Sequence, residues 1–107
     1  MFKWVKGRLG TGYEKLCLCS LLFFDVYLIR FPEGSNINTH IDTVPRGRHF
    51  RLNIVLRKCK KGGEFICLNA LINTPRIKLF RPDVQEHSVT TVLEGSRFIL
   101  SIGWICP

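Results

Sequence analysis

Hydrophobic and polar residues alternate along this chain in short stretches, and the spacing of apolar residues typical of helices is nearly absent. A period of two is the pattern of a strand that buries one of its faces. The breaks between the stretches contain Gly, Pro, Asn and Asp, which favour turns. The sequence therefore predicts an all-β protein, with strands at 15–23, 26–31, 37–41, 50–57, 64–68, 76–80, 88–92 and 98–105.

Eight short strands in 107 residues predict a compact jelly roll. A chain of this length has the size of one small domain, so we predict a single domain over 1–107 with its core in 27–105. The longest apolar run, 16–24, is too short to span a bilayer and is interrupted by Ser20. We expect it to form a buried strand, and we expect no membrane association.

The cysteine content adds an expectation about the compartment. The chain has five cysteines, which is an odd number, and it contains no Cys-x-x-Cys pair of the kind found in zinc ribbons. Reduced thiols in a cytoplasmic protein are the simplest interpretation.

The chain is strongly basic, with 16 Lys and Arg against 8 Asp and Glu and a net charge of +8. Such a charge attracts nucleic acids, acidic proteins and small anions, and it does not choose among them. The densest basic run, 57–61, is followed at once by Gly62 and Gly63. This order favours a solvated hairpin turn over a nucleic-acid contact.

Three residues carry most of the chemistry that the sequence indicates. His40 and Asp42 are two positions apart in a predicted strand, so both side chains lie on one face, and His87 follows after 44 intervening residues. Two imidazoles and one carboxylate form the facial triad that binds non-haem Fe(II) and leaves coordination positions open. An isolated histidine is more often a polar residue bonded to the backbone. The joint pattern of residue types and spacing favours iron ligation.

Further motifs give the chain a family resemblance. They are Gly34 six residues before His40, the 39–42 motif Thr-His-Ile-Asp, the 62–65 motif Gly-Gly-Glu-Phe as a hairpin, and the closing run 87–98. With these motifs, the segment 27–104 resembles the Fe(II)- and 2-oxoglutarate-dependent dioxygenases of the prolyl 4-hydroxylase-like branch. The resemblance implies a double-stranded β-helix, a cupin-like jelly roll, here in a minimal version with little helix.

The resemblance also implies an activity. 2-Oxoglutarate would be the cosubstrate and would be decarboxylated to succinate and carbon dioxide, with Fe(II) as the metal, O2 as the oxidant and ascorbate in support. The product would be a hydroxylated C–H bond, with a protein or peptide residue as the substrate.

For the cosubstrate, the resemblance points to Arg97, ten positions after His87. A guanidinium binds a carboxylate through two parallel hydrogen bonds and keeps its proton. Ser101, four positions further on the same strand face, resembles a hydroxyl that supports the same carboxylate. The tyrosine that such enzymes often supply falls at Phe31 or Val55 here, and neither can donate a hydrogen bond.

The missing contact leaves several candidates. Arg51 and Asn53 share the strand face of Val55, and Tyr13 or Tyr27 could also reach the site.

Two other functions stay open. A nucleic-acid-directed oxygenase of the oxidative demethylase type would suit the basic charge, but that branch carries further arginines where this chain has only Arg97 after residue 95. A non-catalytic cupin-like module that binds a metal or an anion is the second. The chain lacks most of the N-terminal helices that usually cover the larger sheet in the family, and we expect that only the segment 3–15 could cover it. Formation of a homodimer is another way to protect that face.

Overall fold

The computed structural model describes residues 3–7 and 11–106, so the outer ends of the predicted domain and residues 8–10 lie outside it. The described part contains no helix and has twelve strands. They are β1 (Trp4–Lys6), β2 (Glu14–Leu21), β3 (Phe24–Phe31), β4 (Ile37–His40), β5 (Arg48–Arg57), β6 (Lys61–Gly62), β7 (Phe65–Ile66), β8 (Ile72–Asn73), β9 (Ile77–Phe80), β10 (His87–Val89), β11 (Val92–Glu94) and β12 (Arg97–Cys106). Each predicted strand overlaps one of these, which confirms the all-β prediction. The alternation did not indicate the short strands β1, β6, β8 and β11.

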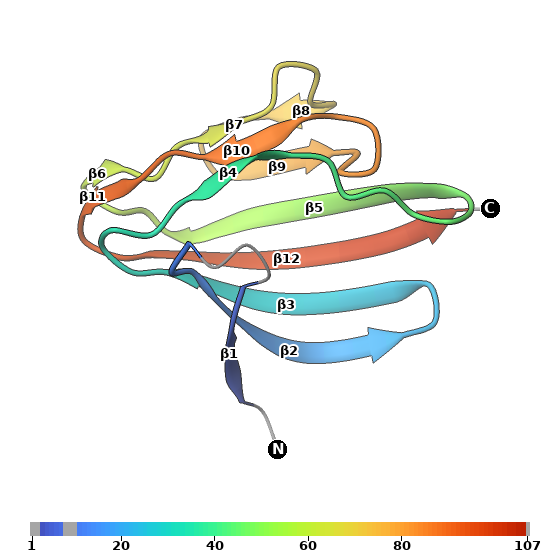
Figure 1. The fold of residues 1–107 in the computed structure, drawn as a ribbon, viewed down its shortest axis with the longest axis horizontal. Helices are drawn as coiled ribbons and strands as arrows, with labels where there is room; N and C mark the ends of the chain where they lie inside the picture. The colour runs from blue at the N-terminus through green and yellow to red at the C-terminus, as the bar shows by residue number, and fades with distance from the viewer. Residues whose placement is uncertain (1–2, 8–10, 107) are drawn as a thin grey trace.

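The strands form two facing layers (Figure 1). The larger layer is a seven-stranded antiparallel sheet in the order β1-β2-β3-β12-β5-β9-β8. Above it lie a three-stranded sheet, β4-β10-β7, and the two-stranded pair β11-β6. The long strand β12 lies between β3 and β5, and its Ser101 is opposite Tyr27 on β3 and Asn53 on β5. Segments far apart in the sequence therefore meet at the middle of the large sheet.

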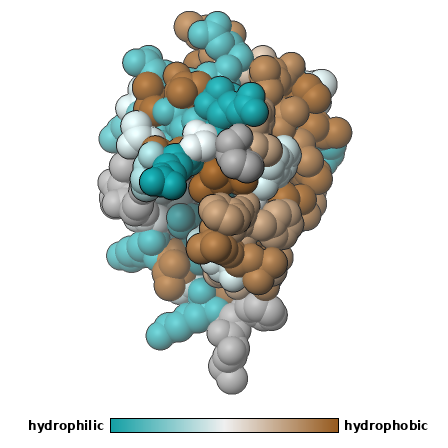
Figure 2. All heavy atoms as spheres, turned by 90° about the vertical axis from the view of Figure 1, so that its right-hand side faces the viewer, coloured by the Kyte–Doolittle hydropathy of each residue, from teal (hydrophilic) through white to brown (hydrophobic). Residues whose placement is uncertain are grey.

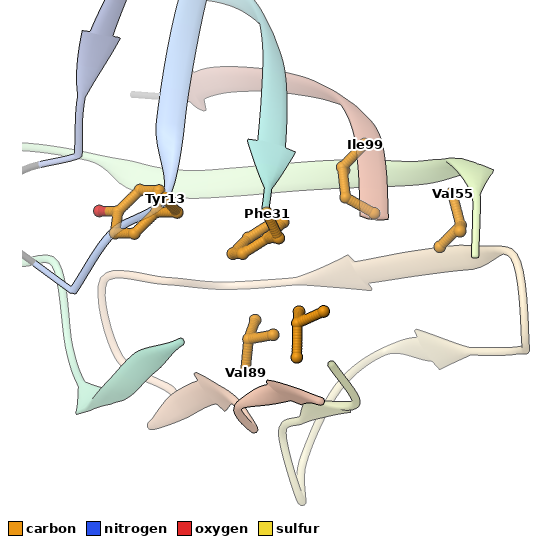
Figure 3. Close-up of a cluster of buried hydrophobic side chains, with 6 residues drawn as sticks. Tyr13, Phe31, Val55, Val89 and Ile99 are labelled. Atoms are coloured by element: carbon orange, nitrogen blue, oxygen red, sulfur yellow. The ribbon is translucent and has the colours of Figure 1, made fainter. Parts of the chain in front are cut away.

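The hydrophobic core fills one part of the space between the two layers (Figure 3). Phe31, Val55 and Ile99 extend from the large sheet toward Val89 on β10, and all four are buried. Tyr13, just before β2, stacks on Phe31 with 5.6 Å between the ring centroids. This packing fixes the distance between the sheets, and with it the position of β10 over β12.

The apolar run 16–24 is not buried, and this prediction is wrong. Leu21, Leu22 and Phe23 at the β2–β3 turn are exposed, Leu22 by 86%. The turn lies at one end of the large sheet, and the view onto that end shows hydrophobic side chains at the surface (Figure 2). A run without polar alternation does not say which residues face the core, so the sequence could not reveal this exposure. The homodimer suggested as cover for the larger sheet stays a prediction.

Gly62 and Gly63 do not close a hairpin either. β6 pairs with β11 rather than with β5, so the chain crosses here from the large sheet to the facing layer. Gly63 has a φ of 62°, which L side chains rarely adopt, and a Cβ there would lie 2.7 Å from Cys59 Sγ. The sequence correctly predicted a glycine-dependent bend after a basic run that is mostly exposed, but assigned it to the wrong connection.

No stretch of the described residues forms a helix with the length and apolar character needed to cross a membrane.

Candidate metal centre

The fold brings the three predicted metal ligands together. His40 is the last residue of β4 and His87 is the first of β10, and the two are direct partners in the antiparallel pair. Asp42 follows β4, where its backbone N–H donates to the carbonyl of Pro82 at 2.6 Å. This bond ties the segment after β4 to the segment that leads into β10, so the carboxylate is positioned beside both imidazoles.

The distances between the ligand atoms suit a single ion. Asp42 Oδ2 lies 3.4 Å from His40 Nε2 and 3.6 Å from His87 Nε2. One ligand atom from each residue lies within 4.8 Å of the other two. Bonds of about 2.1 Å to one metal ion place neighbouring ligand atoms about 3.0–3.4 Å apart, depending on the geometry. The three side chains therefore need only a small inward movement to contact the same ion.

Each imidazole is oriented by a second hydrogen bond. His40 Nδ1 lies 2.7 Å from the carbonyl oxygen of Asn38, and His87 Nδ1 lies 2.9 Å from that of Gln85. A carbonyl only accepts, so Nδ1 carries the proton in both rings and Nε2 keeps a free lone pair toward Asp42. The His87 ring also packs against Phe80, with 5.0 Å between the centroids. Both rings are thus held in the tautomer that leaves Nε2 available to a metal.

The triad opens into a cavity of about 320 Å³ between the two layers. Its lining includes the four residues that the sequence assigned to the cosubstrate: Arg51, Asn53, Arg97 and Ser101. Both tyrosines of the chain, Tyr13 and Tyr27, line it as well. The predicted metal ligands and the predicted cosubstrate residues therefore share one cavity.

Three of those four residues, Arg51, Ser101 and Asn53, are joined by hydrogen bonds. Arg51 Nη1 donates to Ser101 Oγ at 2.8 Å, and Ser101 Oγ donates to Asn53 Oδ1 at 2.6 Å. Arg51 Nη2 donates to Asp25 Oδ1 at 2.7 Å, and this ion pair fixes the guanidinium on the sheet. The charge of Arg51 is already compensated by Asp25, so this arginine has little need of an external anion.

The sequence gave no motif for Asp25, but Gly103 was an indirect signal. Asp25 and Arg51 flank Gly103 on the two neighbouring strands, and the Arg51 guanidinium occupies the space where a Cβ of residue 103 would be. A glycine inside an otherwise apolar strand often marks such a close approach.

His49 also lines the cavity, where it is half-buried. Burial lowers its pKa, and so does the neighbouring Arg51. Its Nδ1 is buried without a hydrogen-bond partner among the described residues.

Arg97 differs from Arg51 because its charge is not compensated. Arg97 is 6% exposed, and no carboxylate of the described residues lies within ion-pair distance of its guanidinium. Its guanidinium lies 5.5 Å from the centroid of the Phe31 ring. Burial lowers the pKa of Arg97, and an opposing effect of Cys59 does not cancel this. A buried cation without an acid partner is costly, and such a site favours an anionic ligand.

Comparisons with solved structures identify the fold class. The chain aligns with KdgF from Halomonas sp. at a TM-score of 0.65 and 13% identity, over 98% of this chain and 87% of that one. It aligns with the cupin domain of Schizosaccharomyces pombe Cnp3 at 0.62 and 10% identity, over 88% of this chain and 61% of that one. A third match, the DMSP lyase DddQ from Ruegeria pomeroyi, has a TM-score of 0.63 and 13% identity, over 98% of this chain and 56% of the lyase.

These likenesses show that the chain has the cupin, or double-stranded β-helix, fold, and they confirm the predicted fold class. At such identities they show the fold alone, and the neighbours include both an enzyme and a domain named only for its fold. No protein-family model and no curated protein matches the sequence. Function must therefore be inferred from the site.

Proposed function

We propose that this protein is an Fe(II)- and 2-oxoglutarate-dependent dioxygenase that hydroxylates an unactivated C–H bond of a protein or peptide residue. The observation that carries the proposal is the content of one cavity. Two imidazoles with free Nε2 lone pairs and one carboxylate meet at one part of it, and Arg97, a buried and uncompensated cation, lines the same cavity.

The residues fit a divalent iron ion. His40, Asp42 and His87 supply two neutral nitrogens and one anionic oxygen, which suit a metal of intermediate hardness and leave room for further ligands. Iron bound there would supply the activation of dioxygen that is coupled to decarboxylation of the cosubstrate. The chain itself holds the ligand atoms in place, fixes both histidine tautomers and lines the site mainly with half-buried and buried side chains.

Arg97 would hold the distal carboxylate of 2-oxoglutarate. The guanidinium offers two parallel N–H donors, and an anion would compensate the charge that burial leaves isolated. Ser101 lies four positions along the same strand face, but it already donates its hydroxyl proton to Asn53, so it would support the carboxylate only by turning that proton away from Asn53. Phe31 and Val55 occupy the positions where such enzymes often carry a tyrosine, and neither side chain has a hydroxyl. Tyr13 and Tyr27 both line the cavity and would be the sources of that hydroxyl.

Turnover tests the proposal most broadly. The purified protein, supplied with Fe(II), ascorbate, O2 and 2-oxoglutarate, should form succinate, and H87A should form none. H49A is a matched control, because His49 lines the cavity but lies outside the triad, and it should keep iron affinity within about threefold. Absence of succinate from the iron-loaded wild type, with every candidate peptide added, would contradict the proposal.

Binding separates the role of Arg97 from that of the triad. R97A should weaken 2-oxoglutarate by about a hundredfold, since a charge-assisted bidentate contact to a buried carboxylate contributes roughly 2–3 kcal/mol. Iron affinity should change by less than threefold. Calorimetry that finds equal affinity of R97A and wild type for the cosubstrate would remove Arg97 from the site.

A non-catalytic metal- or anion-binding module is the second candidate. It is favoured by the hydrogen bonds that Arg51, Ser101 and Asn53 make with one another and with Asp25, because these bonds leave the three side chains little capacity to bind a cosubstrate. Such a module would bind the metal and an anion without producing succinate.

A further inference from the structure

A second cavity of about 390 Å³ lies on the other side of Arg97. It is enclosed by the end of β5, the start of β9 and the connection that crosses from β5 to β7. Only Arg97 and Phe65 belong to the linings of both cavities. Its other lining residues are Val55, Lys58, Cys59, Gly62, Gly63, Glu64, Pro75 and Lys78. None of the three triad residues contributes to it.

The charges in this cavity are unbalanced. Lys58, Lys78 and Arg97 are cationic, Glu64 is the one acid of the lining, and Glu64 is exposed. Lys78 is 8% exposed, as buried as Arg97. No ion pair among the described residues compensates any of the three cations.

The hydrogen bonds of Lys78 do not balance its charge. Its ammonium donates to Asn73 Oδ1 at 2.8 Å and to the carbonyl of Thr74, and both acceptors are neutral. These bonds hold the β8–β9 turn in place, and a neutral donor could make them. An ammonium group also has a third N–H donor. Burial lowers the pKa of Lys78, and the nearby Arg97 and Lys58 lower it further. Two buried cations that repel each other beside a cavity are stable together when an anion lies between them.

We infer that this second cavity is a binding site for a small, doubly charged oxyanion, held by Lys78 and Arg97 with Lys58 at its edge. The guanidinium supplies paired donors in a plane, and the ammonium supplies a compact charge with one free donor. The anion would neutralise the same guanidinium that faces the metal centre. This anion and 2-oxoglutarate would both use Arg97, but the inference needs neither iron nor 2-oxoglutarate and can be tested without them.

The test uses inorganic phosphate as the probe and metal-free full-length protein, with chloride holding the ionic strength constant. Calorimetry should show one phosphate per chain. K78M should weaken binding at least tenfold, and K78R, which keeps the charge, should stay within about threefold of wild type. K60M is the matched control, because Lys60 is a neighbouring lysine with a side chain that is 79% exposed, and it should stay within twofold.

A spectroscopic map locates the site independently of any variant that fails to fold. Addition of phosphate should shift the amide resonances of residues 62–65 and 78 and leave those of His40 and His87 unchanged. K58M, altered at an exposed position, should weaken binding about threefold. H87A should bind phosphate as wild type does, even if that variant has lost iron, and this separates the two proposals. Equal phosphate affinity of K78M and wild type, or shifts spread over all surface lysines, would overturn the inference.

Discussion

Replacement of Arg97 by methionine should stabilise the protein while it abolishes anion binding. Methionine is unbranched and fills space similar to the aliphatic part of arginine, but it carries no charge. The native side chain is a guanidinium that is 6% exposed and has no acid partner among the described residues. The perturbation therefore removes a buried charge and adds an apolar group to the same place.

The expected magnitude follows from opposing contributions. Burial of an unpaired ion costs several kcal/mol after relaxation. The Phe31 ring, 5.5 Å from the guanidinium, recovers about 1–2 kcal/mol of this. Even for a buried ion pair, exchange for apolar groups of similar volume is often neutral or stabilises by about 1–4 kcal/mol, and Arg97 has no acid partner whose attraction would be lost. For a chain of 107 residues, a gain at the low end of this range raises Tm by about 4 °C or more.

Urea unfolding of metal-free protein at pH 7, without added phosphate, measures this difference. R46M is the matched control, because Arg46 is exposed, and it should stay within about 0.5 kcal/mol of wild type. Titration with 2-oxoglutarate should find R97M the weaker binder despite its greater stability. A loss of more than about 1 kcal/mol in R97M would show that the guanidinium is compensated in the folded state, and the reasoning on both cavities would fail.

Three further outcomes test the fold around the site. I99A removes a buried side chain from the first part of β12 and should cost about 2–5 kcal/mol in urea unfolding, whereas a loss below 1 kcal/mol would contradict its place in the core. G63A should cost about 2 kcal/mol or more, because its φ is 62° and the new Cβ would meet Cys59 Sγ at 2.7 Å, and an unchanged Tm would refute that geometry. Burial alone would raise the pKa of Asp83, but hydrogen bonds from Arg81 and from backbone N–H groups lower it below its usual value. This carboxylate therefore stabilises the fold above about pH 4, and the stabilisation is lost as the pH falls through the lowered pKa. D83N should be less stable than wild type by about 1–3 kcal/mol at pH 6, with a gap that narrows at acid pH, and a gap independent of pH would count against the pair.

The strands and the triad could be predicted because each follows from a local rule. Alternation with period two identified the longer strands, and the types and order of His40, Asp42 and His87 identified the group that β4 and β10 bring together. The short strands β6 and β11 could not be found in this way, since a pair of two or three residues has no period to detect.

The remaining features depend on which segments meet in space. The run 16–24 is apolar at almost every position, so its exposure depends on the absence of a covering layer, which no local pattern records. Asp25 and Arg51 form an ion pair across Gly103 only because β3 and β5 both flank β12. The ion pair that compensates the charge of Arg51, and the lack of an acid partner for Arg97 among the described residues, could therefore not be predicted from the spacing of residues in the sequence.

Anaerobic equilibrium dialysis against Fe(II) tests the metal centre most directly. The wild-type chain should retain one iron ion, while H40A, D42A and H87A should each lose at least 90% of that binding at the same free iron concentration and keep a folded circular dichroism spectrum, since removal of one of three ligands costs far more than tenfold. Iron retained equally by the wild type and by all three variants, or not retained by the wild type at all, would contradict the assignment of this cavity as a metal site.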